Sequence, residues 1–171
     1  MPGMSGFELC REVRRRHDDI LVMFLTGAAS VEERLAGFDL GADDYVVKPA
    51  NLNEVTRRAR ALLRRKSGPA SAVSSLDGPS GVRVDRGAHR AFVRGELLNL
   101  TQKEFALLAL LLEHREDVLS ADDISRAVWD YETFGARNFV EKQISRLRSK
   151  LAAAGACNVI ATVRGVGYVV R

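Results

Sequence analysis

VEKQISRLRSKL (Val140–Leu151) and TVRGVGYVV (Thr162–Val170) decide the fold of the carboxyl-terminal part of the chain. In the first stretch the large apolar residues recur at steps of four, three and four, which places them on one face of a helix over 136–151. The second stretch consists of two β-rich runs around a glycine-containing turn, which predicts a hairpin. The apolar face of the helix consists of Val140, Ile144, Leu147 and Leu151.

The side of this helix opposite its apolar face carries side chains that suit DNA. Arg can bond guanine or phosphate, Gln can read adenine, and Lys and Ser can bind backbone oxygens. Residues 136–171 hold seven Lys and Arg against one Glu, so the positive field lies at this end of the chain. A solvated basic helix is the alternative, but a helix followed by such a hairpin is typical of a winged helix. The residues expected at DNA are Arg137, Asn138, Lys142, Gln143, Arg146, Arg148, Lys150 and, on the hairpin tip, Arg164.

Between residues 82 and 129 the sequence predicts a small antiparallel sheet and two further helices. Short apolar stretches alternate with turn residues over 82–100. Thr101 and Glu104 form a capping-box pattern ahead of a leucine-rich core helix. Ser120 opens a shorter helix that ends at Trp129, and we expect this tryptophan in the core.

The amino-terminal part has the pattern of a parallel α/β sheet. Ile20–Leu25 and Tyr45–Val47 are apolar runs of strand length, and helical spacing precedes, separates and follows them. Two parallel strands leave one strand edge and considerable apolar surface open. Residues 67–81 (SGPASAVSSLDGPSG) are small, polar and poor in large apolar groups, so we interpret them as a flexible linker.

Together, these segments resemble the OmpR/PhoB family of response regulators. LTQKEFALLALL, VLSADDISRAVW, VEKQISRLRSKL and TVRGVGYVV follow the order of that family's effector domain. MPGMSGFELC, LTG and GADDYVVKP are similar to the second half of its receiver domain. The resemblance implies an incomplete, flavodoxin-like α/β receiver fragment over 1–66, a linker over 67–81, and an α+β winged helix-turn-helix domain over 82–171.

The family's receiver is phosphorylated on an Asp, next to an acidic pair that binds magnesium. The resemblance places these groups before Pro2, so the phosphoacceptor and the magnesium site are expected to be absent, and no cofactor or metal is expected. Thr26 and Lys48 match the hydroxyl and the lysine that contact the phosphoryl group in the family. Phosphoryl transfer needs a nucleophile and carboxylates that hold a cation, so we do not expect an enzyme.

The resemblance also implies partners. Double-stranded DNA is the expected ligand, bound by a homodimer on tandem half-sites, and a sensor histidine kinase is expected only for an intact receiver. The loop 130–135 would approach RNA polymerase through Tyr131, Glu132 and Phe134, with a plain turn as the alternative. The dimer face would contain Arg34, Asp39, Asp43, Asp44, Glu54, Arg58 and Arg65, with intramolecular surface pairing as the alternative.

Composition excludes several classes of protein. The 171 residues carry a net charge of +4 and are 46 % hydrophobic, which excludes intrinsic disorder. Apolar runs are too short for a membrane span and the amino terminus lacks the order of a secretory signal, so we expect a cytoplasmic protein without membrane contact. Cys10 and Cys157 lack the spacing of a disulfide framework or a zinc site.

The sequence therefore predicts a DNA-binding transcriptional regulator of the two-component type, whose DNA binding is not gated by its own phosphorylation. Two alternatives stay open. The half-receiver could be an interaction module that pairs with an intact response regulator and inhibits it. Alternatively, Met1 could be an internal methionine of a longer regulator.

Overall fold

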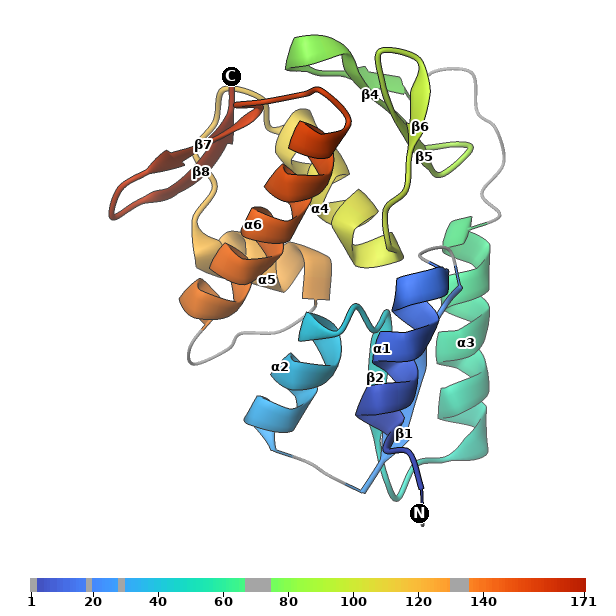
Figure 1. Cartoon of the computed structure of the whole chain (residues 1–171). Coiled ribbons are helices and arrows are strands. Elements are labelled where there is room, and N and C mark those ends of the chain that lie inside the picture. The colour runs from blue at the N-terminus through green and yellow to red at the C-terminus, as the bar shows by residue number, and fades with distance from the viewer. Residues whose placement is uncertain (1–2, 18–19, 28–29, 67–74, 130–135) are drawn as a thin grey trace.

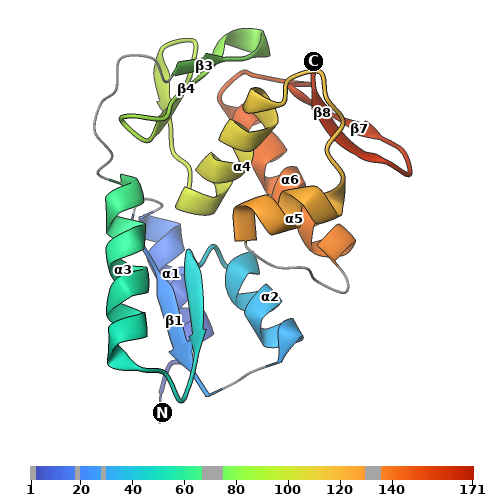
Figure 2. The same ribbon diagram turned by 180° about the vertical axis from the view of Figure 1, so that it is seen from behind.

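The computed structural model describes residues 3–17, 20–27, 30–66, 75–129 and 136–171. Figure 1 shows two parts, of which the lower contains helices α1 to α3 with strands β1 and β2, and the upper contains the elements from β3 to β8. Viewed from behind, α2 lies next to α5 and α6 of the upper part (Figure 2).

The amino-terminal part is a two-stranded parallel sheet with three helices, as the sequence predicts. Strands β1 and β2 pair in parallel, and α2 and α3 lie on opposite sides of them (Figures 1 and 2). Ser5 caps the start of helix α1, and its side chain accepts from the backbone N–H of Glu8 in a capping box. The elements are α1 (Gly6–Arg16), β1 (Met23–Thr26), α2 (Val31–Asp39), β2 (Asp44–Val47) and α3 (Leu52–Lys66).

A row of aromatic rings joins these elements. The ring of Phe7 on α1 lies 5.2 Å from that of Phe24 on β1, which lies 5.8 Å from Tyr45 on β2. The ring of Phe38 on α2 follows at 6.5 Å from Tyr45. Because Tyr45 is buried, its ring is a packing element of this small core.

The expected open surface of this part is confirmed. Within the described chain, β1 pairs only with β2, so its other edge is unpaired. The side chains of Leu9, Leu25 and Leu63 are 55 %, 45 % and 57 % exposed. Strand β1 begins three residues later than the apolar run Ile20–Leu25. Apolar side chains of β1 and of the helices α1 and α3 are therefore only partly covered.

The carboxyl-terminal part begins with a four-stranded antiparallel sheet in the order β3-β4-β5-β6. Strand β3 lies inside the range expected to be linker, so the linker prediction is wrong for residues 75–81. Ser75 to Asp77 pair with β4, and the backbone N–H of Gly78 donates to Val82. An edge strand is held through its backbone, so it forms here with Leu76 as its single large apolar residue. The elements are β3 (Ser75–Asp77), a 3-10 turn (Pro79–Gly81), β4 (Val82–Asp85), β5 (Arg90–Val93) and β6 (Glu96–Leu98).

Three helices and a hairpin complete this part, again as predicted. The hairpin packs closely on the segment before α5, since Leu119 and Tyr168 exchange two backbone hydrogen bonds of 2.9 Å. A β-carbon at Gly167 would lie 2.0 Å from the carbonyl oxygen of Leu119, so this approach requires glycine. No helix in the described part of the chain is both long and apolar enough to span a membrane. The elements are α4 (Gln102–Glu113), α5 (Ala121–Trp129), α6 (Ala136–Ala153), β7 (Ile160–Val163) and β8 (Gly167–Val170).

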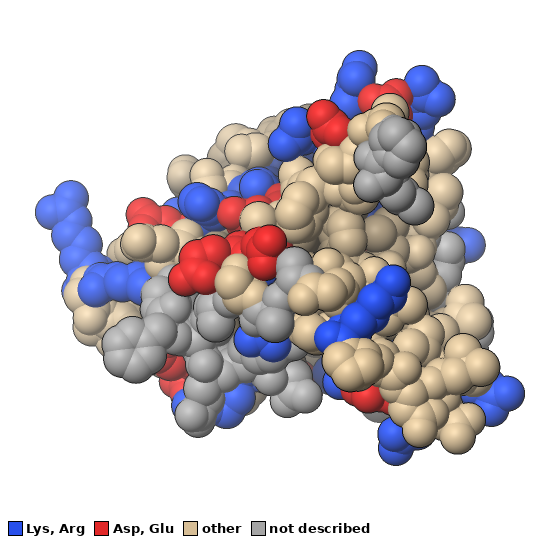
Figure 3. Space-filling model, turned by 90° about the horizontal axis from the view of Figure 1, so that it is seen from below, with Lys and Arg blue, Asp and Glu red and all other residues tan. Residues whose placement is uncertain are grey.

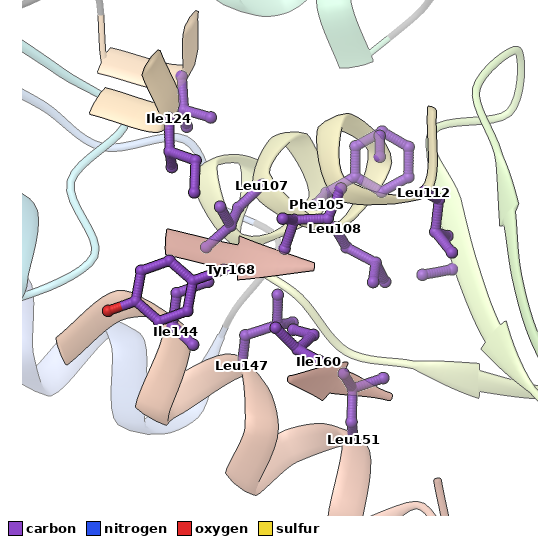
Figure 4. Packing of buried hydrophobic residues seen from close by; sticks show 14 of the residues in the cluster. Phe105, Leu107, Leu108, Leu112, Ile124, Ile144, Leu147, Leu151, Ile160 and Tyr168 are labelled. Carbon is purple, nitrogen blue, oxygen red and sulfur yellow. The ribbon is translucent and has the colours of Figure 1, made fainter. Parts of the chain in front are cut away.

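The hydrophobic core of this part lies between α4, α5, α6 and the hairpin (Figure 4). Leucines of α4 face Ile144, Leu147 and Leu151 of α6, which confirms the apolar face predicted for that helix. The capping box of Thr101 and Glu104 is present, and Trp129 is 4 % exposed, as expected for a core residue. The core therefore fixes the orientation of α6 and its outer face.

Candidate nucleic-acid interface

The outer face of α6 and the tip of the hairpin carry the exposed members of the predicted DNA set. Val140, Ile144 and Leu147 are fully buried, which turns the opposite side of the helix to solvent. On the surface seen from below, positive and negative side chains are interspersed (Figure 3). The predicted residues that lie exposed are Arg137, Asn138, Lys142, Arg146 and, on the hairpin, Arg164.

Arg148 holds the hairpin against α6. Its Nε donates to the carbonyl oxygen of Ile160 at 3.0 Å, and its Nη2 donates to Oγ1 of Thr162 at 2.8 Å. The guanidinium also lies 5.9 Å from the ring centroid of Tyr168, within the range of a cation–π interaction. Two donors of Arg148 thus fix the angle between helix and hairpin in this structure, and its contact with DNA stays a prediction.

Lys150 is engaged with the beginning of α4. Its Nζ donates to Oε2 of Glu104 at 2.9 Å and to the carbonyl oxygen of Asn99 at 3.1 Å. The Glu104 side chain is 8 % exposed and also accepts from the backbone N–H of Thr101. In this structure the nearly buried Glu104 carboxylate binds the ammonium group of Lys150, and the contact of Lys150 with DNA stays a prediction.

Three other predicted DNA-contacting residues converge on Asp39, at the end of α2. Lys142 Nζ lies 3.2 Å from Asp39 Oδ2, and Gln143 Nε2 donates to Asp39 Oδ1 at 3.1 Å. Arg146 donates to the backbone oxygen of Asp39, and its Nη1 lies 3.9 Å from Oδ1. Gln143 is 4 % exposed, which corrects the expectation that it lies on the open face.

Aromatic contacts support this junction between the two parts. The rings of Phe38 on α2 and Phe139 on α6 lie 6.4 Å apart, and Trp129 meets Phe139 edge-on at 4.9 Å. Lys103 Nζ lies 5.9 Å from the Phe38 ring centroid. Sequence reasoning did not identify this contact. The sequence feature that could have indicated it is Phe139, a large apolar residue that adjoins Val140 at the edge of the apolar face of α6.

Thr26 and Lys48 lie together at the carboxyl ends of β1 and β2. Thr26 pairs with Val47, and the backbone N–H of Lys48 donates to the carbonyl oxygen of Thr26 at 2.6 Å. The structure thus brings together the two residues expected to be accessory to phosphorylation. Among the described residues, no group of three or more His, Cys, Asp and Glu side chains is placed to hold a metal ion.

Asp43 is buried, which makes its assignment to a dimer face wrong. Its Oδ2 accepts from Arg14 Nη2 at 2.8 Å and from the backbone N–H of Val22 at 2.7 Å, while no described group hydrogen-bonds its Oδ1. The Asp43 side chain is 1 % exposed. Burial raises the pKa of Asp43, and the Val22 N–H and Arg14 oppose this rise. Arg14 reaches the carboxylate from α1, a contact that sequence spacing does not reveal.

Two family models match the chain, and between them they cover both parts. "Response regulator receiver domain" matches residues 1–60, and "Transcriptional regulatory protein, C terminal" matches residues 95–170. The chain is 39 % identical over 171 residues to "Response regulator ArlR" of Staphylococcus saprophyticus, a match that covers all of this chain and 75 % of the relative. The chain belongs to the OmpR/PhoB family of response regulators. It is also 40 % identical over 171 residues to "Transcriptional regulatory protein PrrA" of Mycobacterium tuberculosis, covering all of this chain and 73 % of that protein.

Solved structures resemble this response regulator both as a whole and in its effector part. A cysteine-to-serine mutant of RitR has a TM-score of 0.64 at 27 % identity, covering 98 % of this chain and 74 % of that one. The DNA-binding domain of CpxR from E. coli has a TM-score of 0.51 at 30 % identity, covering 56 % and 94 %. The Klebsiella pneumoniae RstA DNA-binding domain, solved in complex with the RstA box, has a TM-score of 0.50 at 27 % identity, covering 56 % and 95 %. The fold is thus a receiver fold followed by a winged helix.

The remaining residues of the predicted dimer face are partly paired within this response regulator. Arg58 Nε lies 3.1 Å from Glu54 Oε1, and Arg58 Nη1 lies 3.5 Å from Asp44 Oδ1. Arg34 is half-buried on α2. The side chain of Arg65 and the loop residues Tyr131, Glu132 and Phe134 lie outside the described parts of the chain, so their assignments to the dimer face and to RNA polymerase stay predictions.

Proposed function

We propose that this response regulator binds specific DNA sequences through α6 and the β7–β8 hairpin and thereby controls transcription. The observation that carries the proposal is the exposed row of Arg137, Asn138, Lys142 and Arg146 on a helix whose inner face is fixed in the core. An α-helix fits the major groove of B-DNA, where Arg and Asn side chains discriminate base edges. Arg164 is exposed at the tip of the hairpin, and in this mode of binding it would contact the adjacent minor groove. The similarity to a DNA-binding domain solved with its DNA box supports this mode of binding.

Fluorescence anisotropy against DNA from upstream of the protein's own gene tests this function. We expect the upstream duplex to be bound more tightly than a shuffled duplex of equal length. We also expect the logarithm of the binding constant to fall linearly with the logarithm of the salt concentration, since basic side chains release counterions from the phosphates. Equal and weak binding to both duplexes would contradict sequence-specific recognition.

A homodimer on tandem half-sites is the expected form on DNA. Ion pairs at the rim of an interface contribute only about 0–1 kcal/mol each, so exposed charges such as Arg58 would set register more than affinity. A duplex with two half-sites should therefore bind two chains, and a single half-site should bind one more weakly.

This chain is expected to take up no phosphoryl group. The groups at the carboxyl ends of β1 and β2 are Thr26 and Lys48, and neither is a carboxylate. Asp43 and Asp44 lie at the opposite end of β2, and Asp43 is buried against Arg14. Incubation with acetyl phosphate and magnesium followed by intact mass spectrometry should leave the mass unchanged. An adduct of one phosphoryl group would contradict this expectation.

The open edge of β1 supports a second candidate function, in which the amino-terminal part pairs with an intact response regulator and modulates it. An unpaired strand edge beside exposed leucines is a place where another chain can add. Co-purification with a complete receiver domain would favour this function. A chain that binds DNA equally well with and without such a receiver would argue against it.

A further inference from the structure

We propose that a cavity between β5, β6 and the beginning of α4 binds a small planar molecule that carries a lactam or carboxamide group. The cavity has a volume of about 460 Å³, within the range of about 300–1,000 Å³ that is usual for small-molecule sites. It is separate from the face proposed to bind DNA, since it lies on other elements. The residues that carry the inference are Leu21 of the amino-terminal part and His89, Leu97, Leu98, Gln102 and Phe105.

Apolar and aromatic side chains form much of the cavity wall. Leu98 and Phe105 are buried, and the ring centroids of His89 and Phe105 lie 3.8 Å apart, so a planar molecule can pack against aromatic surface. Leu21 closes the cavity from the amino-terminal part, beside which Figures 1 and 2 place the beginning of α4. Leu97 is 57 % exposed, so the cavity opens to solvent and a ligand can enter.

Gln102, the first residue of α4, supplies the polar group of this cavity. Its side chain lines the cavity and is 9 % exposed, and both Nε2 and Oε1 are buried. No group in the described ranges of the chain hydrogen-bonds either atom. Folded proteins contain few such amides, because a buried polar group without partners loses the hydrogen bonds that water gives it in the unfolded chain. The Gln102 amide is therefore left with a donor and an acceptor to offer.

The polar groups next to Gln102 in the sequence are engaged elsewhere. Thr101 Oγ1 accepts from the backbone N–H of Glu104, and Glu104 Oε2 accepts from the backbone N–H of Thr101 and from Lys150. The carbonyl oxygen of Asn99 accepts from the same ammonium group. These bonds cap α4 and hold it against α6. The hydrogen bonds that the Gln102 amide lacks are thus left for a molecule bound in the cavity.

The chemistry of an amide defines the class of ligand. The Gln102 side chain presents an N–H donor beside a C=O acceptor, and a lactam or a primary carboxamide presents the complementary acceptor and donor at the same spacing. Gln forms a bidentate pair of this kind with adenine. The remainder of the ligand should be uncharged, because an ion would lose its hydration against the apolar wall. Arg90 also lines the cavity, but it is exposed and keeps its charge in solvent.

The probe for this site is 2-quinolinone, a planar bicyclic lactam. Its control is N-methyl-2-quinolinone, which keeps the carbonyl group and the rings but lacks the N–H donor. Isothermal titration calorimetry with the full chain measures the affinity of both. We expect the wild type to bind 2-quinolinone about tenfold more tightly than the methylated compound, because the latter leaves Gln102 Oε1 without a donor.

Gln102→Met tests the role of the amide, and Gln143→Met is its matched control. These are the two glutamines of the chain, and both are buried, but Gln143 Nε2 donates to Asp39 at 3.1 Å. Gln102→Met should bind 2-quinolinone about tenfold more weakly than the wild type and should no longer distinguish the two compounds. Gln143→Met should bind both compounds as the wild type does.

Thermal unfolding without any probe gives a second readout. Gln102→Met replaces an amide without partners by an apolar side chain of similar size, so its Tm should rise. Gln143→Met removes a buried amide that has a partner, so its Tm should fall.

Ala88→Leu tests the cavity itself. Ala88 lines the cavity and is exposed, so the larger side chain takes up space there without replacing a core residue. We expect this variant to bind both compounds at least about tenfold more weakly than the wild type, because added volume excludes the ligand.

The outcomes that overturn the inference are distinct from any result with DNA. Absence of 2-quinolinone binding by the wild type overturns the site, and so do equal affinities for the wild type, Gln102→Met and Ala88→Leu. Equal binding of the two compounds by the wild type overturns the lactam or carboxamide as ligand class. A lower Tm for Gln102→Met without probe overturns the amide without partners on which that class depends. None of these measurements contains DNA, so the proposed function is tested separately.

Discussion

Replacing Arg14 with methionine is expected to lower the free energy of unfolding of the amino-terminal part by about 3–5 kcal/mol. The Arg14 side chain is 9 % exposed and pairs with Asp43, whose side chain is 1 % exposed. It also donates to the carbonyl oxygens of Gly41 and Ile20. The methionine would leave a buried carboxylate without its counter-charge, and the desolvation of that charge would no longer be offset. Hydrogen exchange of the β1 and β2 amides measures the loss, because it reports local opening free energies.

Arg16→Met is the matched control for this variant. Arg16 lies on the same helix, is 72 % exposed and pairs with Glu12 at 2.8 Å. An exposed ion pair of this kind contributes about 0–1 kcal/mol, so the hydrogen exchange of the β1 and β2 amides should change little in Arg16→Met. Similar protection of the β1 and β2 amides in both variants would contradict a stabilising role for the buried pair.

The pH dependence of Arg14→Met provides a further check on its mechanism. Burial already raises the pKa of Asp43 in the folded protein, and loss of Arg14 should raise it further. The folded state then binds a proton that the unfolded state releases above its own pKa of about 3.9. The free energy of unfolding of Arg14→Met must therefore fall as the pH rises through the pKa that Asp43 has in the folded protein. The free energy of unfolding of Arg14→Met should be close to that of Arg16→Met at about pH 4, and it should be lower by the whole expected amount at about pH 7.

Lys150→Met is expected to destabilise the carboxyl-terminal part by about 2 kcal/mol while leaving the salt dependence of DNA binding unchanged. The variant removes the cation at 2.9 Å from the nearly buried Glu104 carboxylate. Because the ammonium group faces α4, no phosphate contact is lost. Urea unfolding followed by Trp129 emission measures the stability, and anisotropy over several salt concentrations measures the slope.

Lys142→Met should show the opposite pattern. Lys142 is 62 % exposed and its ion pair with Asp39 is partly exposed, so its loss should cost little stability and should make the salt slope shallower by about one unit. If Lys150→Met also reduced the slope, Lys150 would reach DNA after the domains rearrange, as the sequence alone predicts.

The sequence predicted the elements whose signals are local. The steps between Val140 and Leu151 predicted α6 and its buried face, and the capping box at Thr101 predicted the start of α4. Glycines between two β-rich runs predicted the hairpin. Each of these features depends on neighbours within a few residues along the chain, so periodicity and residue type were sufficient.

The contacts that the sequence did not reveal depend on partners far away in the sequence. Gln143 and Lys150 lie at the edge of the apolar face of α6, where helical spacing cannot say whether a side chain meets solvent or another element. Asp39, a residue 104 positions away, covers Gln143, and Glu104 binds Lys150. Asp43 and Asp44 are adjacent, yet Arg14 buries the first while the second stays near the surface. The sequence did not predict β3. This strand is held by backbone pairing with β4, and such pairing leaves no pattern in the composition.

The sheet of the carboxyl-terminal part begins at β3, inside the range expected to be linker, and this limits how far the two parts of the chain can separate. Helix α3 ends at Lys66 and β3 begins at Ser75, so the eight residues 67–74 join them. At about 3.5 Å per residue, this tether spans at most roughly 28 Å. A short tether keeps joined partners at a mutual concentration of the order of millimolar. While α6 is separated from α2, Asp39 therefore stays within this distance of the helix, and its contacts with Lys142 and Gln143 can form again without a second molecule.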